Sequence, residues 1–274
     1  MDAQKKTYRG RIAPTPSGFL HIGHLQTFKT ACARAKKCGG KIVLRIEDID
    51  SARCKKEYIE QIFTDLKNAG IEWDEGPGKG GNFAPYAQSQ RFDLYKKRLE
   101  ELIEKKKVYP CFASRAQIKE KAKICPGNGE AIFPIELRPK KWEMPRDIFK
   151  CNWRFMVGEA SPIEFFDEMC GAQKFIPQRD FGDFLVWRKS GEPSYELAVV
   201  ADDIAMEITE VVRGMDLLVS TARQILLYRA FGAEIPKFAH CPLILDESGK
   251  KLSKSVLKNF FQSEALIKNL RKPE

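Results

Sequence analysis

Arg11-Ile-Ala-Pro-Thr-Pro-Ser-Gly-Phe-Leu-His-Ile-Gly-His24 joins a short apolar run to a helical pattern through a loop of restricted shape. Proline fixes the backbone angle φ in this loop, and Gly18 permits a close approach of the backbone to another group. The loop leads into a helix N-terminus, where amide groups and the helix dipole favour a phosphate. His21 and His24 lie three residues apart at that helix start, so both imidazoles can donate to one phosphate. A surface turn with solvated histidines explains this stretch equally well, so the remaining chain has to decide.

The composition indicates a globular protein with a basic surface. Of the 274 residues 43% are hydrophobic, and no run approaches the roughly 20 apolar residues of a membrane span. The N-terminus lacks the apolar stretch of a secretory signal, so we expect a cytoplasmic protein without a membrane partner. The formal charge of +10 favours a polyanionic partner. Eight scattered cysteines form no Cys-x-x-Cys pair, so neither a disulfide framework nor a four-cysteine zinc site is expected.

The order of the first periodic segments predicts an α/β fold with a parallel sheet. A strand at residues 8–13, a helix at 25–36 that ends at Gly39-Gly40, and a buried strand at 41–46 form a βαβ unit. Ligands of such sheets bind at the carboxyl ends of the strands. The loop after the first strand lies at that edge, which favours the phosphate site.

Acidic residues follow the second strand at the same edge. The carboxylate of Glu47, Asp48 or Asp50 can hold an ammonium group or a sugar hydroxyl there. The alternative is that Asp50 or Ser51 caps the next helix without any ligand. That helix is predicted at 58–69, and Gly70 ends it.

The middle of the chain departs from this pattern. Residues 72–87 are rich in Gly and Pro and predict a loop, and a helix at 91–106 is expected with Ser89 as its cap. Residues 111–171 then show mixed periodicity, which indicates an inserted subdomain. We therefore expect four segments, namely the first half of a Rossmann-like α/β domain (1–110), an inserted subdomain (111–171), the second half of the α/β domain (172–255) and a helical tail (256–274).

The second half of the α/β domain is expected to resume the sheet. Residues 183–188, 197–201 and 208–213 predict strands, and the middle one is a continuous apolar run typical of a strand buried on both faces. A helix at 220–231 precedes a further strand at 240–246. The last strand runs into a polar loop with three lysines, which suits a polyphosphate, although an exposed basic turn is the alternative.

Two motifs at opposite ends of the chain resemble the signatures of class I aminoacyl-tRNA synthetases. They are His21-Ile-Gly-His24 and Lys251-Leu-Ser-Lys-Ser255. Intervening segments are similar to the catalytic domain of glutamyl-tRNA synthetases, namely Arg11-Ile-Ala-Pro-Thr-Pro-Ser-Gly18, Leu44-Arg-Ile-Glu-Asp-Ile-Asp50, Val199-Val-Ala-Asp-Asp203, Val212-Arg-Gly-Met-Asp216 and Thr221-Ala-Arg-Gln224. The resemblance implies a catalytic domain with a class I Rossmann-like parallel sheet. It also implies that the inserted α/β subdomain at 111–171 contacts RNA.

Because only a short tail follows the second motif, the chain resembles the glutamyl-Q tRNA(Asp) synthetases, the truncated paralogues of that family. Conventional members continue into a large anticodon-reading domain. The resemblance implies activation of L-glutamate with ATP and Mg²⁺, and its attachment to queuosine in the anticodon of tRNA(Asp). These paralogues often carry zinc, but here only Cys111 and Cys125 fall near the ligand positions, so we expect no metal site.

The resemblance also assigns roles to single residues. Glu47 would hold the ammonium group of glutamate and Arg213 one of its carboxylates, and the other glutamate-binding residues would be Arg11, Ala13, Thr15 and Tyr195. The ATP-binding residues would be Gly18, His21, Gly23, His24, Lys251 and Lys254. Among these, catalysis would fall to His21, His24 and Lys254.

Three alternatives remain open at this point. A truncated glutamyl-tRNA synthetase would charge the 3′ end of tRNA(Glu), and a requirement for queuosine separates it from the paralogue. A non-catalytic RNA-binding paralogue would have lost the chemistry, but both signature motifs are intact. A nucleotidyltransferase that makes a small-molecule adenylate shares the fold, but fits the glutamate-family segments less well. We expect a monomer in each case.

Overall fold

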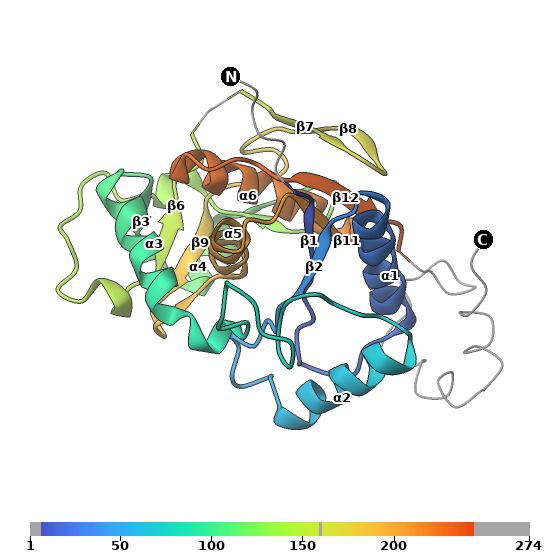
Figure 1. Cartoon of the computed structure of the whole chain (residues 1–274). Helices are drawn as coiled ribbons and strands as arrows, with labels where there is room; N and C mark the ends of the chain where they lie inside the picture. Colours follow the sequence, from blue (N-terminus) through green and yellow to red (C-terminus); the bar gives the residue numbers. More distant parts are fainter. Residues whose placement is uncertain (1–6, 159–160, 244–274) are drawn as a thin grey trace, which may run out of the picture. The chain divides into compact units, whose positions relative to one another are not determined.

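The computed structural model of this chain describes residues 7–158 and 161–243. They fall into two compact units, each built from separate stretches of sequence (Figure 1). Of the described residues, the first unit comprises 7–90, Ile208–Asp216 and 238–243, and the second comprises 91–158, 161–207 and Leu217–Lys237. The expected segments 1–110, 111–171, 172–255 and 256–274 remain a prediction from the sequence. None of the helices in the described ranges combines the length and apolarity needed to cross a bilayer.

The first unit begins with the predicted βαβ arrangement. Strands β1 (Arg9–Ile12) and β2 (Lys41–Leu44) pair in parallel, and α1 (Ile22–Lys37) connects them (Figure 1). The helix ends because Gly39 takes a left-handed φ of +60°. At Gly40 a Cβ atom would lie 2.4 Å from the carbonyl oxygen of Tyr8, so only glycine fits between helix and strand. The parallel pair β1 and β2 with its connecting helix α1 confirms the α/β fold class.

The core of the first unit packs around this pair of strands. Helix α2 (Lys56–Asn68) buries Ile62 and Leu66, and the unit also contains β11 (Glu210–Gly214) and its neighbour β12 (Lys237–Cys241). Helix α1 packs against β1, β2 and β11. The buried side chains of this core include Ile12, Leu25, Phe28, Leu44, Ile71, Val212 and Ala239.

Neither the alternative cap at Asp50 or Ser51 nor the expected cap at Ser89 is present. The N-cap of α2 is Lys55, without a side-chain hydrogen bond, and Asp50 instead accepts from Arg53 Nε at 2.6 Å. Ser89 lies in a short 3-10 helix, Gln88–Gln90, where its hydroxyl donates to Asp48 Oδ2 at 2.7 Å. Each local hydrogen bond takes the polar side chain away from the following helix.

The second unit is built on an antiparallel sheet with strand order β10-β9-β6-β3. Helices α3 (Phe92–Glu104), α5 (Tyr195–Ala205) and α6 (Leu218–Phe231) pack against one another in this unit. The sheet strands are β3 (Val108–Pro110), β6 (Trp153–Phe155), β9 (Phe184–Arg188) and β10 (Glu192–Pro193). Smaller elements are α4 (Arg115–Lys121), β4 (Lys123–Ile124), β5 (Ala131–Ile132), β7 (Ile163–Asp167) and β8 (Gly171–Phe175), with 3-10 turns at Ile135–Leu137 and Ile148–Lys150. A further 3-10 turn, Met215–Leu217, follows β11.

The second unit overturns one strand prediction. Residues 197–201 are part of α5, whose N-cap Ser194 accepts from the backbone N–H of Leu197 at 3.3 Å. These residues are buried on every side, so they show no polar face and no helical period. The strand expected at 183–188 exists as β9, but it joins the antiparallel sheet. The helix expected at 220–231 is confirmed as α6, which ends at the left-handed Gly232.

Candidate active site

The two histidines of the first motif form the N-terminus of α1. His21 is the N-cap, and its Nδ1 accepts from the backbone N–H of His24 at 3.3 Å. In return, the Nδ1 of His24 accepts from the backbone N–H of His21 at 3.3 Å. The two rings stack with centroids 3.6 Å apart. Because each Nδ1 is an acceptor, a neutral ring carries its proton on Nε2, where it can donate to an anion.

Glycine makes this histidine arrangement possible. A Cβ atom at Gly23 would lie 3.1 Å from Cε1 and Nδ1 of the His21 ring. The missing side chain therefore leaves room for the ring to fold back over the helix start. Gly18 lies in the loop before it, between Pro16 and Leu20, both of which are buried. The loop is thus anchored on both sides of its flexible residue.

Two predicted arginines are buried in neighbouring strands of the first unit. Arg11 on β1 is 4% exposed, and its Nη1 donates to the carbonyl oxygen of Val212 at 2.8 Å. Arg213 follows Val212 on β11, is 5% exposed, and donates from Nε to His240 Nε2 at 3.2 Å. Both guanidinium groups are thus buried in the first unit, where a cation is favoured only beside an anion or a hydrogen-bond acceptor.

Glu47 lies beside the loop that carries Ala13 and Thr15, two of the residues predicted to bind the substrate glutamate. Its backbone N–H donates to the carbonyl oxygen of Pro14 at 3.0 Å, between Ala13, which is half-buried, and Thr15, which is exposed. The Glu47 carboxylate is 8% exposed and pairs with Arg45 Nη2 at 3.0 Å. The structure therefore brings together the predicted carboxylate and the predicted loop of the first unit.

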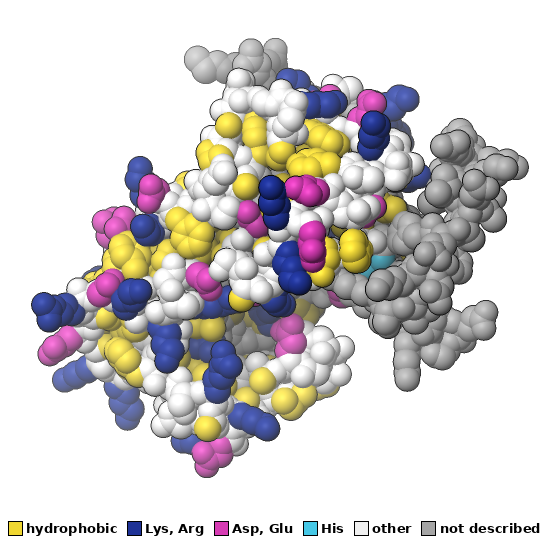
Figure 2. Space-filling view, turned by 90° about the horizontal axis from the view of Figure 1, so that it is seen from below, with side chains coloured by type: hydrophobic (Ala, Val, Ile, Leu, Met, Phe, Trp, Pro, Cys, Tyr) yellow, Lys and Arg dark blue, Asp and Glu magenta, His cyan; other side chains and the backbone are white. Residues whose placement is uncertain are grey.

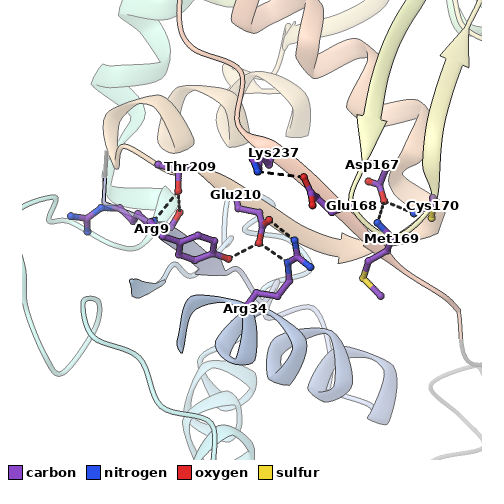
Figure 3. A network of polar contacts seen from close by, with 10 residues as sticks. Arg9, Arg34, Asp167, Glu168, Met169, Cys170, Thr209, Glu210 and Lys237 are labelled. Carbon is purple, nitrogen blue, oxygen red and sulfur yellow. Dashed lines mark hydrogen bonds and ion pairs between the residues drawn. The ribbon is translucent and has the colours of Figure 1, made fainter. Parts of the chain in front are cut away.

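A polar network anchors α1 to β11 in this unit. Arg34 donates from Nε and Nη2 to the two carboxylate oxygens of Glu210, both at 2.7 Å (Figure 3). The Tyr8 hydroxyl donates to the same carboxylate at 2.6 Å. Burial raises the pKa of Tyr8, and the hydrogen bond to Glu210 raises it further, so the phenol stays protonated. This network holds the helix that carries both histidines.

Tyr195 belongs to the second unit, where it lines a cavity of about 400 Å³. Three arginines and three acidic residues line this cavity, which gives it a polar lining. Arg223 pairs with Glu130 and with Glu196, the neighbour of Tyr195 in the chain. The complete lining comprises Glu130, Ala131, Phe133, Arg154, Gly182, Asp183, Phe184, Leu185, Arg188, Ser194, Tyr195, Glu196 and Arg223.

Asp183 organises one wall of the cavity and was not anticipated from the sequence. Its carboxylate accepts from the Tyr109 hydroxyl at 2.6 Å, from Arg138 Nε at 2.5 Å and from the backbone N–H of Val157 at 2.8 Å. Burial and the Asp183 charge raise the pKa of Tyr109. No local pattern marks this aspartate, because its partners come from distant segments of the chain.

The remaining predicted residues fall outside these two sites. Lys251 and Lys254 lie beyond the described residues. Within the described ranges, no group of three or more His, Cys, Asp or Glu residues is placed to hold a metal ion. Cys111 and Cys125 are buried thiols of the second unit.

Comparison with known proteins identifies the class. Residues 7–273 match the family described as tRNA synthetases class I (E and Q), catalytic domain, and the chain belongs to this family of ligases. The glutamyl-Q tRNA(Asp) synthetase of Symbiobacterium thermophilum is 43% identical over 255 residues, which cover 89% of this chain and 77% of that protein. The enzyme of the same name from Nitratidesulfovibrio vulgaris is 40% identical, covering 90% and 77%.

Longer relatives are also similar. Glutamate–tRNA ligase 2 of Caldanaerobacter subterraneus subsp. tengcongensis is 41% identical over 254 residues, which cover 91% of this chain and 52% of that protein. The crystal structure of the glutamate-tRNA synthetase from Elizabethkingia anophelis is 32% identical with a TM-score of 0.80, covering 93% and 54%. The chain thus spans about half the length of these two synthetases, and the likeness supports the class I fold.

Proposed function

We propose that this chain activates L-glutamate with ATP and transfers the glutamyl group to queuosine in the anticodon of tRNA(Asp). The observation that carries the proposal is the placement of Arg11, Arg213 and Glu47 in the unit whose α1 begins with His21 and His24. Membership of the synthetase family supports the activation step. The names of two relatives, each more than three-quarters covered by this chain, support the choice of acceptor.

The glutamate site follows from charge. Arg213 presents a planar guanidinium that can bind a carboxylate through two parallel hydrogen bonds, and Arg11 adds a second buried cation. Glu47 supplies the opposite charge for the ammonium group. Ala13 and Thr15 border the site from the loop, and the family pattern adds Tyr195 to the proposed glutamate-binding residues.

The ATP site follows from the geometry of α1. The Nε2–H groups of His21 and His24 donate to the triphosphate, and Gly18 and Gly23 let the backbone approach it. Lys251 and Lys254 would add positive charge as pyrophosphate leaves. Mg²⁺ shares the phosphate charge when bound, and the phosphate oxygens are its natural ligands.

The reaction needs little covalent help from the protein. An α-carboxylate oxygen of glutamate attacks the α-phosphorus of ATP, and the bond to the pyrophosphate oxygen breaks, leaving glutamyl-adenylate. A hydroxyl of the RNA then attacks the acyl carbon, and AMP leaves as the hydroxyl proton is lost. Positioning and electrostatic stabilisation carry both steps. The net positive charge favours the RNA, and Figure 2 shows Lys and Arg side chains spread over one face among Asp and Glu.

Charging of the 3′ end of tRNA(Glu) is the second candidate, because a glutamate–tRNA ligase is 41% identical to this chain. Labelled glutamate, ATP and Mg²⁺ are supplied with two matched tRNA pools, one with queuosine and one from cells unable to make it. Label only in the first pool supports transfer to queuosine, whereas equal label in both supports the second candidate. Absence of both label and glutamate-dependent ATP–pyrophosphate exchange would identify a non-catalytic paralogue.

A further inference from the structure

The third histidine of the chain is buried next to a residue of the proposed glutamate site. His240 on β12 has no exposed surface, and its Nε2 lies 3.2 Å from Nε of Arg213 on β11. Arginine can only donate a hydrogen bond, so the imidazole must accept it. The Nε2 atom of His240 therefore carries no proton in this arrangement.

A second side chain of β12 lies against the same guanidinium. The central carbon of the Arg213 guanidinium is 5.8 Å from the ring centroid of Phe238, a distance within reach of a cation–π contact. Phe238 and His240 are two residues apart on the strand, so they share one face, and their ring centroids are 6.2 Å apart. One face of β12 thus supports Arg213 with both an acceptor and an aromatic ring.

We propose that His240 is a positioning residue, which orients Arg213 for the carboxylate of glutamate; this inference rests on the proposed function. The guanidinium is a rigid planar fork, so a hydrogen bond at Nε fixes the plane of its Nη groups. A carboxylate then meets the fork through the two Nη atoms. His240 holds the Arg213 side chain in one conformation before glutamate binds. Binding therefore costs less conformational entropy.

The acceptor at Nε2 is the feature to test. His240→Gln places an amide oxygen near the position of Nε2, whereas His240→Leu removes the acceptor and keeps a buried apolar side chain. Arg213→Ala serves as the reference for loss of the carboxylate contact. ATP–pyrophosphate exchange, measured with tRNA present, yields separate KM values for glutamate and ATP, and thermal unfolding reports the fold.

We expect His240→Leu to raise the KM for glutamate about 10- to 100-fold with little change in the KM for ATP. His240→Gln is expected to stay within a few-fold of the wild-type value. An unchanged KM for glutamate in His240→Leu would overturn the inference, as would equal impairment of the Gln and Leu variants. Where the leucine variant does not fold, His240→Asn, whose oxygen falls short of the Nε2 position, replaces it.

The reference variant separates the two levels of the proposal. If Arg213→Ala raises the KM for glutamate while His240→Leu does not, only the positioning role of His240 fails. If Arg213→Ala leaves the KM for glutamate unchanged, the proposed glutamate site itself is wrong.

Discussion

His21 and His24 cap each other: the Nδ1 atom of each accepts the backbone N–H of the other at 3.3 Å. The same two side chains therefore cap the N-terminus of α1 with Nδ1, which leaves the Nε2–H group of each ring on the side away from the capping hydrogen bond. Capping uses Nδ1, whereas the proposed phosphate contact would use Nε2 on the other side of the imidazole ring. The two roles can be separated by substitution.

His21→Asn tests this separation. Asparagine is a strong N-cap and its oxygen can accept the backbone N–H of His24, but it has no group in the position of Nε2. We expect ATP–pyrophosphate exchange to fall about 10²- to 10³-fold with stability nearly unchanged. His21→Ala should show the same loss of rate together with about 1 kcal/mol of destabilisation. Normal exchange in His21→Asn would show that the Nε2 donor is not used.

Gly23→Ala separates helix stability from ring placement. Alanine is the better helix former by about 1 kcal/mol, so thermal stability should not fall. Its Cβ would lie 3.1 Å from the His21 ring, which must shift by a few tenths of an ångström. We expect the exchange rate to fall about 10-fold or more, because the Nε2 donor moves with the ring. Full activity in a folded Gly23→Ala variant would contradict this constraint.

Glu75 gives the first unit an acid-sensitive contact. Its 7%-exposed side chain accepts from Arg9 at 2.7 Å and Lys41 at 3.3 Å. Burial alone would raise the pKa of Glu75, but these two cations outweigh it and hold the pKa below its ordinary value of 4.5. A lowered pKa in the folded state stabilises the protein above pH 4.5, and this stabilisation is lost as the pH falls below that value.

Urea unfolding of Glu75→Gln at several pH values checks this contact. We expect the variant to be about 1–3 kcal/mol less stable than the wild type at pH 7, with the difference shrinking below pH 4.5. Glu57→Gln is the matched control, because Glu57 and Lys55 form an exposed pair that should contribute little. A stability difference that does not depend on pH would rule out the ionised Glu75 as its source.

Local patterns predicted the first unit well. The loop before His21, the helix ended by Gly39 and the buried second strand all carry short-range signals, and each was confirmed. The same holds for α6, which Gly232 ends. Motif residues such as Arg11 and Arg213 match a family pattern, and their assignment to one site stays a prediction.

Features that depend on contacts between distant parts of the chain could not be predicted from the sequence. Helix α5 is enclosed by other elements of its unit, so Leu197 to Ala201 show the same apolar run as a buried strand. The hydrogen-bond partners of Asp183 come from three separate segments of the chain. His240 accepts a hydrogen bond from Arg213, which lies 27 residues earlier on another strand. Such groupings exist only after the chain has folded.

Arg11→Lys tests whether the buried arginine acts as a fork or as a charge. Lysine keeps the positive charge but lacks the planar group that lets Arg11 bind the Val212 carbonyl oxygen at 2.8 Å and still face a carboxylate. We expect the KM for glutamate to rise about 10- to 100-fold, with the KM for ATP unchanged. Arg53→Lys is the control, because the Arg53 side chain is 72% exposed and should tolerate the change. Equal KM values in wild type and Arg11→Lys would mean that only the charge at this position matters, since the charge is all that lysine retains.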